Sequence, residues 1–176
     1  MTLQPTASRL AGTVAGLALA LAGCAGYEYK LNERTVFEGP RPFTDYAIAD
    51  EALRECVAQA IADQRITRAD ALEDLNCAHA GIGSLAGLEV FTGLRHVRLD
   101  DNALADLAPL HGLRALELLQ VRGNRLRSLD TALCRGAPKK IALARNEQLD
   151  CATVDRLRAC GATIVDLPAH CTAGAR

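Results

Sequence analysis

The chain has 176 residues, which is enough for one compact domain with a substantial core and too few for two. Hydrophobic residues make up 49% of it but aromatic residues only 3%, with no Trp, so the core must be built from Leu, Ile, Val and Ala. The formal net charge of -1 excludes the strong positive field that attracts nucleic acids, and we expect no nucleic-acid partner.

Residues 1–23 have the layout of an export signal. Arg9 provides the positive charge, and residues 10–21 form an apolar run that Gly and Thr interrupt. A run of this length is too short to span a bilayer as a helix, so we interpret residues 1–23 as a signal peptide.

The signal ends in Leu21-Ala22-Gly23-Cys24, which resembles the lipobox of bacterial lipoproteins. The resemblance implies cleavage before Cys24 and acylation of its thiol and new amino group, and two or more acyl chains anchor a protein durably. Because Ala25 stands where an inner-membrane retention signal usually has Asp, it also implies the outer membrane, on the periplasmic side more than at the cell surface. The alternative is an ordinary secretory signal with a coincidental Cys.

Residues 24–47 show neither a helical nor a strand period, and we interpret them as a tether whose aromatic end packs on the next segment. That segment, residues 48–71, has apolar residues at helical spacing from Leu53 to Ile61. Asp50 is a suitable N-cap residue. We expect a helical cap there, covering the open end of the domain core.

Residues 72–150 repeat with a step of 22 residues. The step relates Leu75 to Val97, Leu119 and Ile141, and the same step relates Asn102 to Asn124 and Asn146. The central copy reads Leu-x-x-Val-x-Leu-x-x-Asn-x-Leu-x-x-Leu from Leu94 to Leu107. Several columns in phase over three or four copies indicate a repeat architecture.

This pattern resembles the short, 22-residue leucine-rich repeats of bacterial proteins such as internalins. The resemblance implies an α/β solenoid with a parallel sheet on its concave face. The residues agree, because Val97 and Leu99 flank a polar residue as on a strand with one buried face. A single coil cannot bury its own apolar edge and must stack on the next. We expect the Asn column to bond turn backbone groups, and 3₁₀-like return segments near Pro109.

Residues 151–176 are predicted to form a C-terminal cap. Val154 and Leu157 lie on one helical face after Asp150, Gly161 is a suitable stop, and Thr163 to Val165 are predicted to form a last short strand.

Six cysteines besides Cys24 form an even set, as expected for disulfides in an oxidising compartment: Cys56, Cys77, Cys134, Cys151, Cys160 and Cys171. A zinc site is one weaker alternative, because there is no Cys-x-x-Cys pair, and buried free thiols are another. Sequence does not choose among the 15 connectivities of six cysteines. We expect Cys56 to pair with Cys77, and we favour Cys134 with Cys160 and Cys151 with Cys171.

Catalytic motifs are absent from the sequence, so we expect no enzyme activity, no cofactor and no metal ion. Asp100 and Asp101 resemble part of a cation site, but we interpret them as a solvated edge. His79 and His96 are interpreted as surface residues without a carboxylate or thiol partner.

The outward strand positions offer a binding surface, and the residues that we expect to contact a ligand are Arg98, Asp100, Leu118, Gln120 and Arg122. We therefore expect a membrane-anchored, monomeric envelope protein that binds a protein or peptide through its concave face. Two alternatives remain: this face is merely soluble, or the chain is a structural envelope spacer with no dedicated ligand.

Overall fold

The structure is a computed structural model that describes residues 29–31, 34–37, 40–129 and 138–171. It divides the chain into two compact units, residues 1–39 and residues 40–176. The predicted signal peptide, the lipobox cysteine Cys24, and Cys134 lie outside the described residues.

The first unit contains an antiparallel pair of strands, β1 (Tyr29–Leu31) and β2 (Arg34–Phe37). The sequence-based interpretation of this segment assigned it no strand, and that was wrong. Strands of three and four residues are too short for an alternating pattern to stand out. The residue types do favour extended chain, since Thr35, Val36 and Phe37 are β-branched or aromatic.

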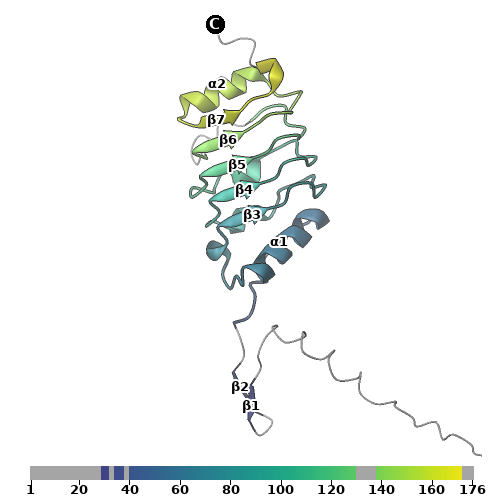
Figure 1. The fold of residues 1–176 in the computed structure, drawn as a ribbon, viewed down its shortest axis with the longest axis vertical. Helices are drawn as coiled ribbons and strands as arrows, with labels where there is room; N and C mark the ends of the chain where they lie inside the picture. Colours follow the sequence, from purple (N-terminus) through teal and green to yellow (C-terminus); the bar gives the residue numbers. More distant parts are fainter. Residues whose placement is uncertain (1–28, 32–33, 38–39, 130–137, 172–176) are drawn as a thin grey trace, which may run out of the picture. The chain divides into compact units, whose positions relative to one another are not determined.

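The second unit is built on a parallel sheet of five strands in sequence order. Leu75, Val97, Leu119 and Ile141 stand side by side, as the 22-residue step predicts. Figure 1 shows the strands stacked one above another, with α1 at the β3 end and α2 at the β7 end. The strands are β3 (Asp74–Asn76), β4 (His96–Arg98), β5 (Leu118–Gln120), β6 (Lys140–Ala142) and β7 (Thr163–Asp166).

The core lies between the sheet and the return segments. Leu99, Val121 and Leu143 form one fully buried column, and the repeat leucines beyond the Asn position, such as Leu104 and Leu126, are equally buried. Each coil therefore completes the burial of its neighbours, as the repeat pattern predicts. Terminal coils deviate: Leu149 is buried one residue later than the repeat places an aliphatic residue, while Gln148 is exposed.

The Asn column forms a hydrogen-bond ladder that confirms its predicted role. Asn124 Nδ2 donates to Leu99 O at 2.9 Å and to Val121 O at 3.1 Å, and its Oδ1 accepts from Leu104 N at 3.0 Å. Asn102 and Asn146 repeat this arrangement one coil before and one coil after. Each amide satisfies turn groups of two successive coils that burial would otherwise leave unpaired.

The residue before each Asn position has a left-handed backbone. His79, Asp101, Gly123 and Arg145 have φ between 56° and 61° and are spaced by the repeat. Sequence inspection missed this column, because only one of its four members is the glycine that such a conformation favours. The left-handed turn bends the chain sharply out of the sheet.

Short 3₁₀ helices form the return segments, as predicted. They are η2 (Leu88–Val90) and η3 (Ala108–Leu110), which Pro109 helps to start because its fixed φ suits a first helical turn. Leu88 and Leu110 each point into the core. Another 3₁₀ turn, η1 (Ala69–Ala71), leads from the N-terminal cap into the first coil.

Helix α1 (Glu51–Asp63) covers the N-terminal end of the core with Leu53, Val57 and Ile61, as predicted. Asp50 caps it: Oδ1 accepts from Leu53 N at 3.0 Å, while Oδ2 accepts from Gly83 N at 2.8 Å and from Ser84 N at 3.0 Å. Burial acts to raise the pKa of Asp50, but these amide hydrogen bonds outweigh it and hold the pKa below its ordinary value. One carboxylate thus starts the helix and ties it to the first coil.

An aromatic group lies beside this cap. Phe91 is fully buried, and the rings of Phe43 and Tyr46 pack against it with centroids 6.0 and 5.4 Å away. Phe43 N also donates to Ile66 O at 2.8 Å. The rings thus pack on Phe91 of the repeat region, whereas the prediction named residues 48–71, which the Phe43 backbone contacts at Ile66.

Helix α2 (Cys151–Ala159) lies in the C-terminal cap and left-handed Gly161 follows its end, as predicted. The side chain of Asp150 caps its N-terminus, a role that the sequence analysis did not assign. Strand β7 and η5 (Ala169–Cys171) complete the cap. Within the described residues, no helix is both long and apolar enough to cross a bilayer.

Disulfides join both caps to the coils. Cys56 of α1 pairs with Cys77, which fills an inward position after β3, and Cys151 of α2 pairs with Cys171 of η5. Both pairings agree with the sequence-based expectation. Cys160 is also disulfide-bonded, and its expected partner Cys134 lies outside the described residues. A native bridge typically stabilises a fold by about 2–4 kcal/mol.

Candidate binding face of the sheet

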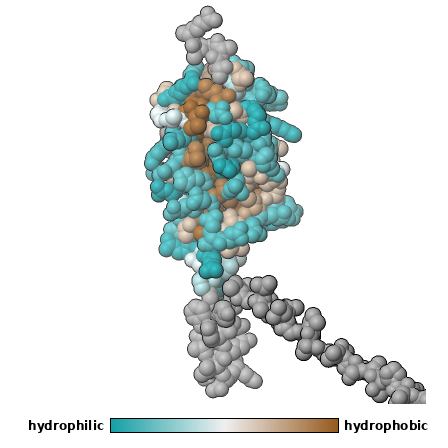
Figure 2. Space-filling view, viewed as in Figure 1, coloured by the Kyte–Doolittle hydropathy of each residue, from teal (hydrophilic) through white to brown (hydrophobic). Residues whose placement is uncertain are grey.

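The outward side chains of the strands form three columns across the sheet. The register places Asp74, His96, Leu118, Lys140 and Thr163 in the first, and Asn76, Arg98, Gln120, Ala142 and Asp166 in the second. Ala78, Asp100, Arg122 and Ala144 follow two residues later in the repeat as the third. Figure 2 shows a band of hydrophobic side chains along the stacked strands, flanked by hydrophilic ones.

Two hollows adjoin on this face. The first measures about 310 Å³ and extends over β3, β4 and β5, between Gln64 and Gln120. The second measures about 300 Å³ and is lined by Glu117, Lys139 and Lys140. His96 and Leu118 line both hollows, so the two lie next to each other, and we refer to them together as the depression over β3 to β6.

Polar side chains on this face bond to their neighbours one coil away. Arg98 Nε donates to Gln120 Oε1 at 2.7 Å, and His96 Nδ1 lies 2.7 Å from Asp74 Oδ1. Since parallel strands are about 4.8 Å apart, long side chains of one column reach each other without bending the backbone. These contacts orient the Arg98 side chain over the sheet.

Arg122 is held on the sheet face by two carboxylates. Its Nε donates to Asp166 Oδ2 at 2.9 Å, and its Nη1 lies 3.3 Å from Asp100 Oδ2. Asp100 also accepts from Arg122 N at 2.8 Å, and its side chain is only 14% exposed. The Arg122 guanidinium therefore has less capacity left for a ligand than that of Arg98.

A second charge contact passes over a glycine. Arg145 Nη1 lies 2.8 Å from Asp101 Oδ1, although the two residues are two coils apart. Gly123 stands between them, and a Cβ at that position would lie 2.2 Å from Asp101 Oδ1. The hydrogen bond from Arg145 to Asp101 raises the pKa of Arg145 above its ordinary value. The missing side chain makes this contact possible.

Glu117 links three coils at the margin of the second hollow. Its Oε1 lies 3.1 Å from Lys139 Nζ and 2.6 Å from Arg95 Nη2. The hydrogen bond from Lys139, followed by the charges of Arg95 and Lys139, holds the pKa of Glu117 below its ordinary value. Glu117 is therefore ionised at neutral pH and forms an ion pair with each of the two cations.

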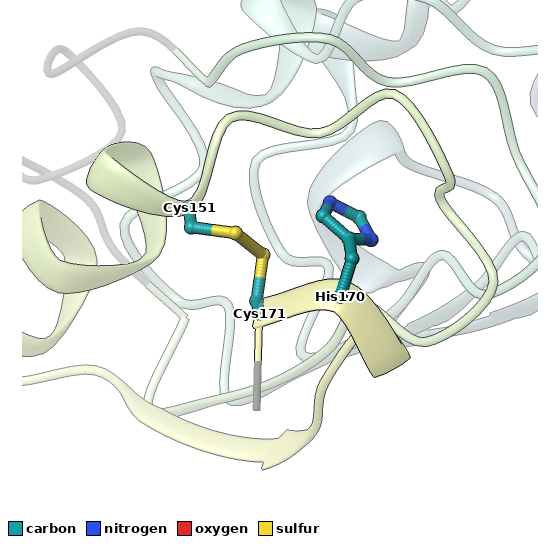
Figure 3. A group of neighbouring side chains, drawn as sticks. All are labelled: Cys151, His170 and Cys171. Atoms are coloured by element: carbon teal, nitrogen blue, oxygen red, sulfur yellow. A yellow bond between two sulfur atoms is a disulfide. The ribbon is translucent and has the colours of Figure 1, made fainter. Parts of the chain in front are cut away.

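The C-terminal cap brings Cys151, Cys171 and His170 together (Figure 3). These are the ligand types of a zinc site, and their ligand atoms lie within 4.8 Å of one another. However, Cys151 and Cys171 are bonded to each other, so neither sulfur is available as a thiolate. His170 Nε2 lies 2.8 Å from Leu149 O. In this oxidised form the disulfide fastens the cap, and neither sulfur can act as a thiolate ligand.

Three features establish the architecture: the stacked parallel strands, the buried Leu columns and the Asn ladder. The fold is a leucine-rich-repeat solenoid. Among solved structures it is similar to an internalin of Listeria monocytogenes, with a TM-score of 0.56 and 21% identity over 68% of this chain and 36% of that one. It is also similar to internalin C2 of the same species, with a TM-score of 0.54 and 21% identity over 68% of this chain and 56% of that one.

This chain spans about a third to a half of those two proteins, and at this identity the similarity establishes the fold alone. No protein-family model matches the sequence. No curated protein matches it either.

The five residues predicted to contact a ligand separate into two groups on this leucine-rich-repeat face. Arg98, Leu118 and Gln120 line the first hollow. Asp100 and Arg122 do not line it and instead pair with each other beside Asp166. Whether any of them binds a ligand stays a prediction.

One sequence-based interpretation of this face was wrong. Asp100 and Asp101 are not a solvated edge, because both carboxylates have basic partners and their side chains are 14% and 27% exposed. His79 and His96 are exposed, as predicted, but they do have carboxylate partners: His79 Nε2 lies 3.6 Å from Asp101 Oδ2, and His96 Nδ1 lies 2.7 Å from Asp74 Oδ1. The step of 22 residues relates His96 to Asp74, and could have revealed that pair.

Sequence reasoning about ligand contacts also missed Lys140 and Asn76, which line the depression beside the predicted residues. Both belong to the outward columns that the repeat defines, so their positions were predictable. Their role was not, because burial and charge pairing on the face follow from side-chain conformations.

Proposed function

We propose that this chain is a lipid-anchored protein of a bacterial cell envelope whose leucine-rich-repeat sheet binds a protein or peptide. The observation that carries the proposal is the depression over β3 to β6, which is polar at its margins and contains the half-buried Leu118. A concave surface with a few oriented polar groups is typical of a binding site.

The lipobox sequence ending at Cys24 supports the anchoring part of the proposal. Disulfides in both caps support export, because such bonds persist in oxidising compartments. Ala25 after the lipidated cysteine favours the outer membrane and its periplasmic leaflet. We propose that the protein acts there as a monomer without catalytic activity or cofactor.

The anchor is tested by replacing Cys24 with Ser in cells that are fed an alkyne analogue of palmitate. The native chain should carry the label and sediment with outer membranes, whereas the C24S chain should carry none and be released. Ala25→Asp provides a matched control, because it should keep the label and move the chain to the inner membrane. Label on C24S would refute lipidation at this cysteine.

Binding is tested by photocrosslinking in intact cells. A photoreactive residue replaces Asn76, which is exposed at the first hollow, and in a control strain it replaces Arg114, which is exposed before β5. We expect a discrete adduct from position 76 that is absent from position 114 and lost when Arg98 is changed to Glu. Arg122 is unsuitable for such a reversal, because its partners Asp100 and Asp166 would lose their counter-charge.

The alternative function is a structural spacer without a ligand. It predicts no discrete adduct from position 76, or equal adducts from positions 76 and 114 that persist in the Arg98→Glu chain. Either result would remove the binding proposal and leave the anchor unaffected.

A further inference from the structure

Two cations of the outward columns are left without an acidic partner. All three acids of these columns are paired: Asp74 with His96, and Asp100 and Asp166 with Arg122. Among the described residues, no carboxylate lies within ion-pair distance of Arg98 or Lys140. The nearby Glu117 forms its ion pairs with Arg95 and Lys139. The face therefore carries two cationic side chains that have no direct ionic partner on it.

Arg98 is arranged to bind an anion. Its Nε donates to the neutral Gln120, which holds the side chain in place and leaves both terminal nitrogens free of a carboxylate. Those two nitrogens form the donor pair that binds a carboxylate in bidentate fashion. Gln120 thus acts as a positioning residue for the guanidinium.

An apolar contact lies between the two cations. Leu118 is half-buried, lines both hollows, and sits beside Lys140 in the first column. Arg98 of β4 lies opposite Gln120 in the second column, and Gln120 is two residues after Leu118 on β5. A diagonal from Arg98 to Lys140 therefore crosses β5 between Leu118 and Gln120.

The length of that diagonal fits an extended peptide. Two strand spacings of about 4.8 Å and two residues of about 3.3 Å each separate the Cα atoms of Arg98 and Lys140 by about 12 Å. In an extended peptide the first, third and fifth side chains point to one side, and the first and fifth are about 13 Å apart. The first and fifth side chains of such a peptide can therefore reach Arg98 and Lys140, while the third lies over Leu118.

We propose that this face binds an extended peptide segment with the pattern acidic-x-aliphatic-x-acidic, with its acids on Arg98 and Lys140 and its aliphatic side chain on Leu118. The proposal rests on the binding function proposed above and names the class of its partner. A polyanion or an anionic lipid surface fits less well, because these are bound by clusters of basic residues. Here the two free cations stand apart with an aliphatic side chain between them.

The test uses the full-length chain in a non-ionic detergent and a fluorescein-labelled peptide, Gly-Ser-Glu-Thr-Leu-Thr-Glu-Ser-Gly, followed by fluorescence anisotropy. One comparison peptide has both Glu replaced by Gln. A second has the same composition with the two Glu adjacent. We expect the neutral peptide to bind about tenfold more weakly than the first, with the adjacent-Glu peptide between them.

Variants of the protein locate the contact. Arg98→Gln should weaken binding of the first peptide about tenfold, and Lys140→Gln about threefold, since a lysine contact lacks the bidentate geometry. Arg114→Gln removes the same charge away from the face and should change affinity less than about twofold. The replaced side chains are exposed, and melting curves verify that each variant folds.

The possible results distinguish a failure of the acidic peptide pattern from a failure of the proposed binding function. Equal binding of the neutral peptide, an equal loss in Arg114→Gln, or displacement of the peptide by equimolar inorganic polyphosphate would overturn the acidic pattern. No peptide binding together with a discrete crosslink from position 76 would overturn it too, while leaving the binding function in place. Absence of both would overturn both proposals.

Discussion

The two faces of the same five strands follow different rules. On the inner face, Leu75, Val97 and Leu119 are at most 2% exposed, and each is aliphatic. On the outer face, the first column changes from Asp74 to His96 to Leu118 within three coils. The inner positions repeat in kind, whereas the outer ones vary in size, charge and exposure.

The inner and outer positions differ in variability because their side chains have different packing requirements. An inner side chain contacts the coils before and after it in a close-packed interior, so a change of volume affects three coils at once. An outer side chain needs only a partner within reach, as Arg98 has in Gln120 and Glu117 has in Lys139. The inner face therefore specifies the solenoid, and the outer face is free to specify a ligand.

The largest effect is expected for Leu99→Ala on the inner side. Leu99 is fully buried, so its truncation leaves a cavity and should lower the free energy of unfolding by about 2–5 kcal/mol. Chemical denaturation of the oxidised protein measures it. Leu118→Ala on the outer face is the matched control and should cost clearly less, because that side chain is only half-buried. Equal losses would erase the distinction between the faces.

Asn146→Ala should have an intermediate effect. Asn146 is fully buried, and its removal leaves Val121 O, Leu143 O and Leu126 N without their partner. We expect a loss of about 1–3 kcal/mol in the free energy of unfolding. Asn102→Ala should cost less, since Asn102 is only half-buried and water can replace its amide. A tolerated Asn146→Ala would mean that the ladder contributes nothing to stability.

Glu117→Gln on the outer face is expected to have the smallest effect. The folded-state pKa of Glu117 lies below its ordinary value of 4.5, so its ion pairs contribute stability above that pH and lose it as the pH falls through the folded value. At pH 7 the melting temperature should hardly change, because exposed ion pairs contribute little. Below pH 4.5 the variant should lose less stability than the native chain. A steeper acid dependence of the variant would contradict the assigned direction.

The fold was predictable to the level of register. The 22-residue step that pairs Leu75 with Val97 also predicted the Asn ladder. The local sequence predicted Asp50 as a helix N-cap, and the expected Cys56–Cys77 pairing is present. All of these depend on local chemistry or on a period, and both are visible along a chain. The β1–β2 pair was missed because its strands are too short to show a period.

The candidate site was predictable only in part. The repeat identified Arg98, Leu118 and Gln120 as outward residues, and they do line the first hollow. It placed Asp100 and Arg122 in the same group, but they are held in ion pairs with each other and with Asp166. Asp166 is two steps of 22 residues from Arg122, but it comes from β7, beyond the predicted repeat residues 72–150, and the register of β7 with β6 is irregular, so the sequence analysis did not consider it as a partner.

By itself, the sequence determined which side chains face inward, because burial selects aliphatic residues at every turn of the chain and this selection leaves a periodic pattern. Only the tertiary structure decided which charges cancel. Arg145 reaches Asp101 across two coils because Gly123 has no side chain to block it, and Arg122 turns to Asp166 on a strand outside the repeat. Both pairs are two steps of 22 residues apart, but the step does not show which side chains reach each other over the intervening coil. Arg98 and Lys140 are therefore identified as the cations of the outward columns without a carboxylate partner only once the coils are stacked.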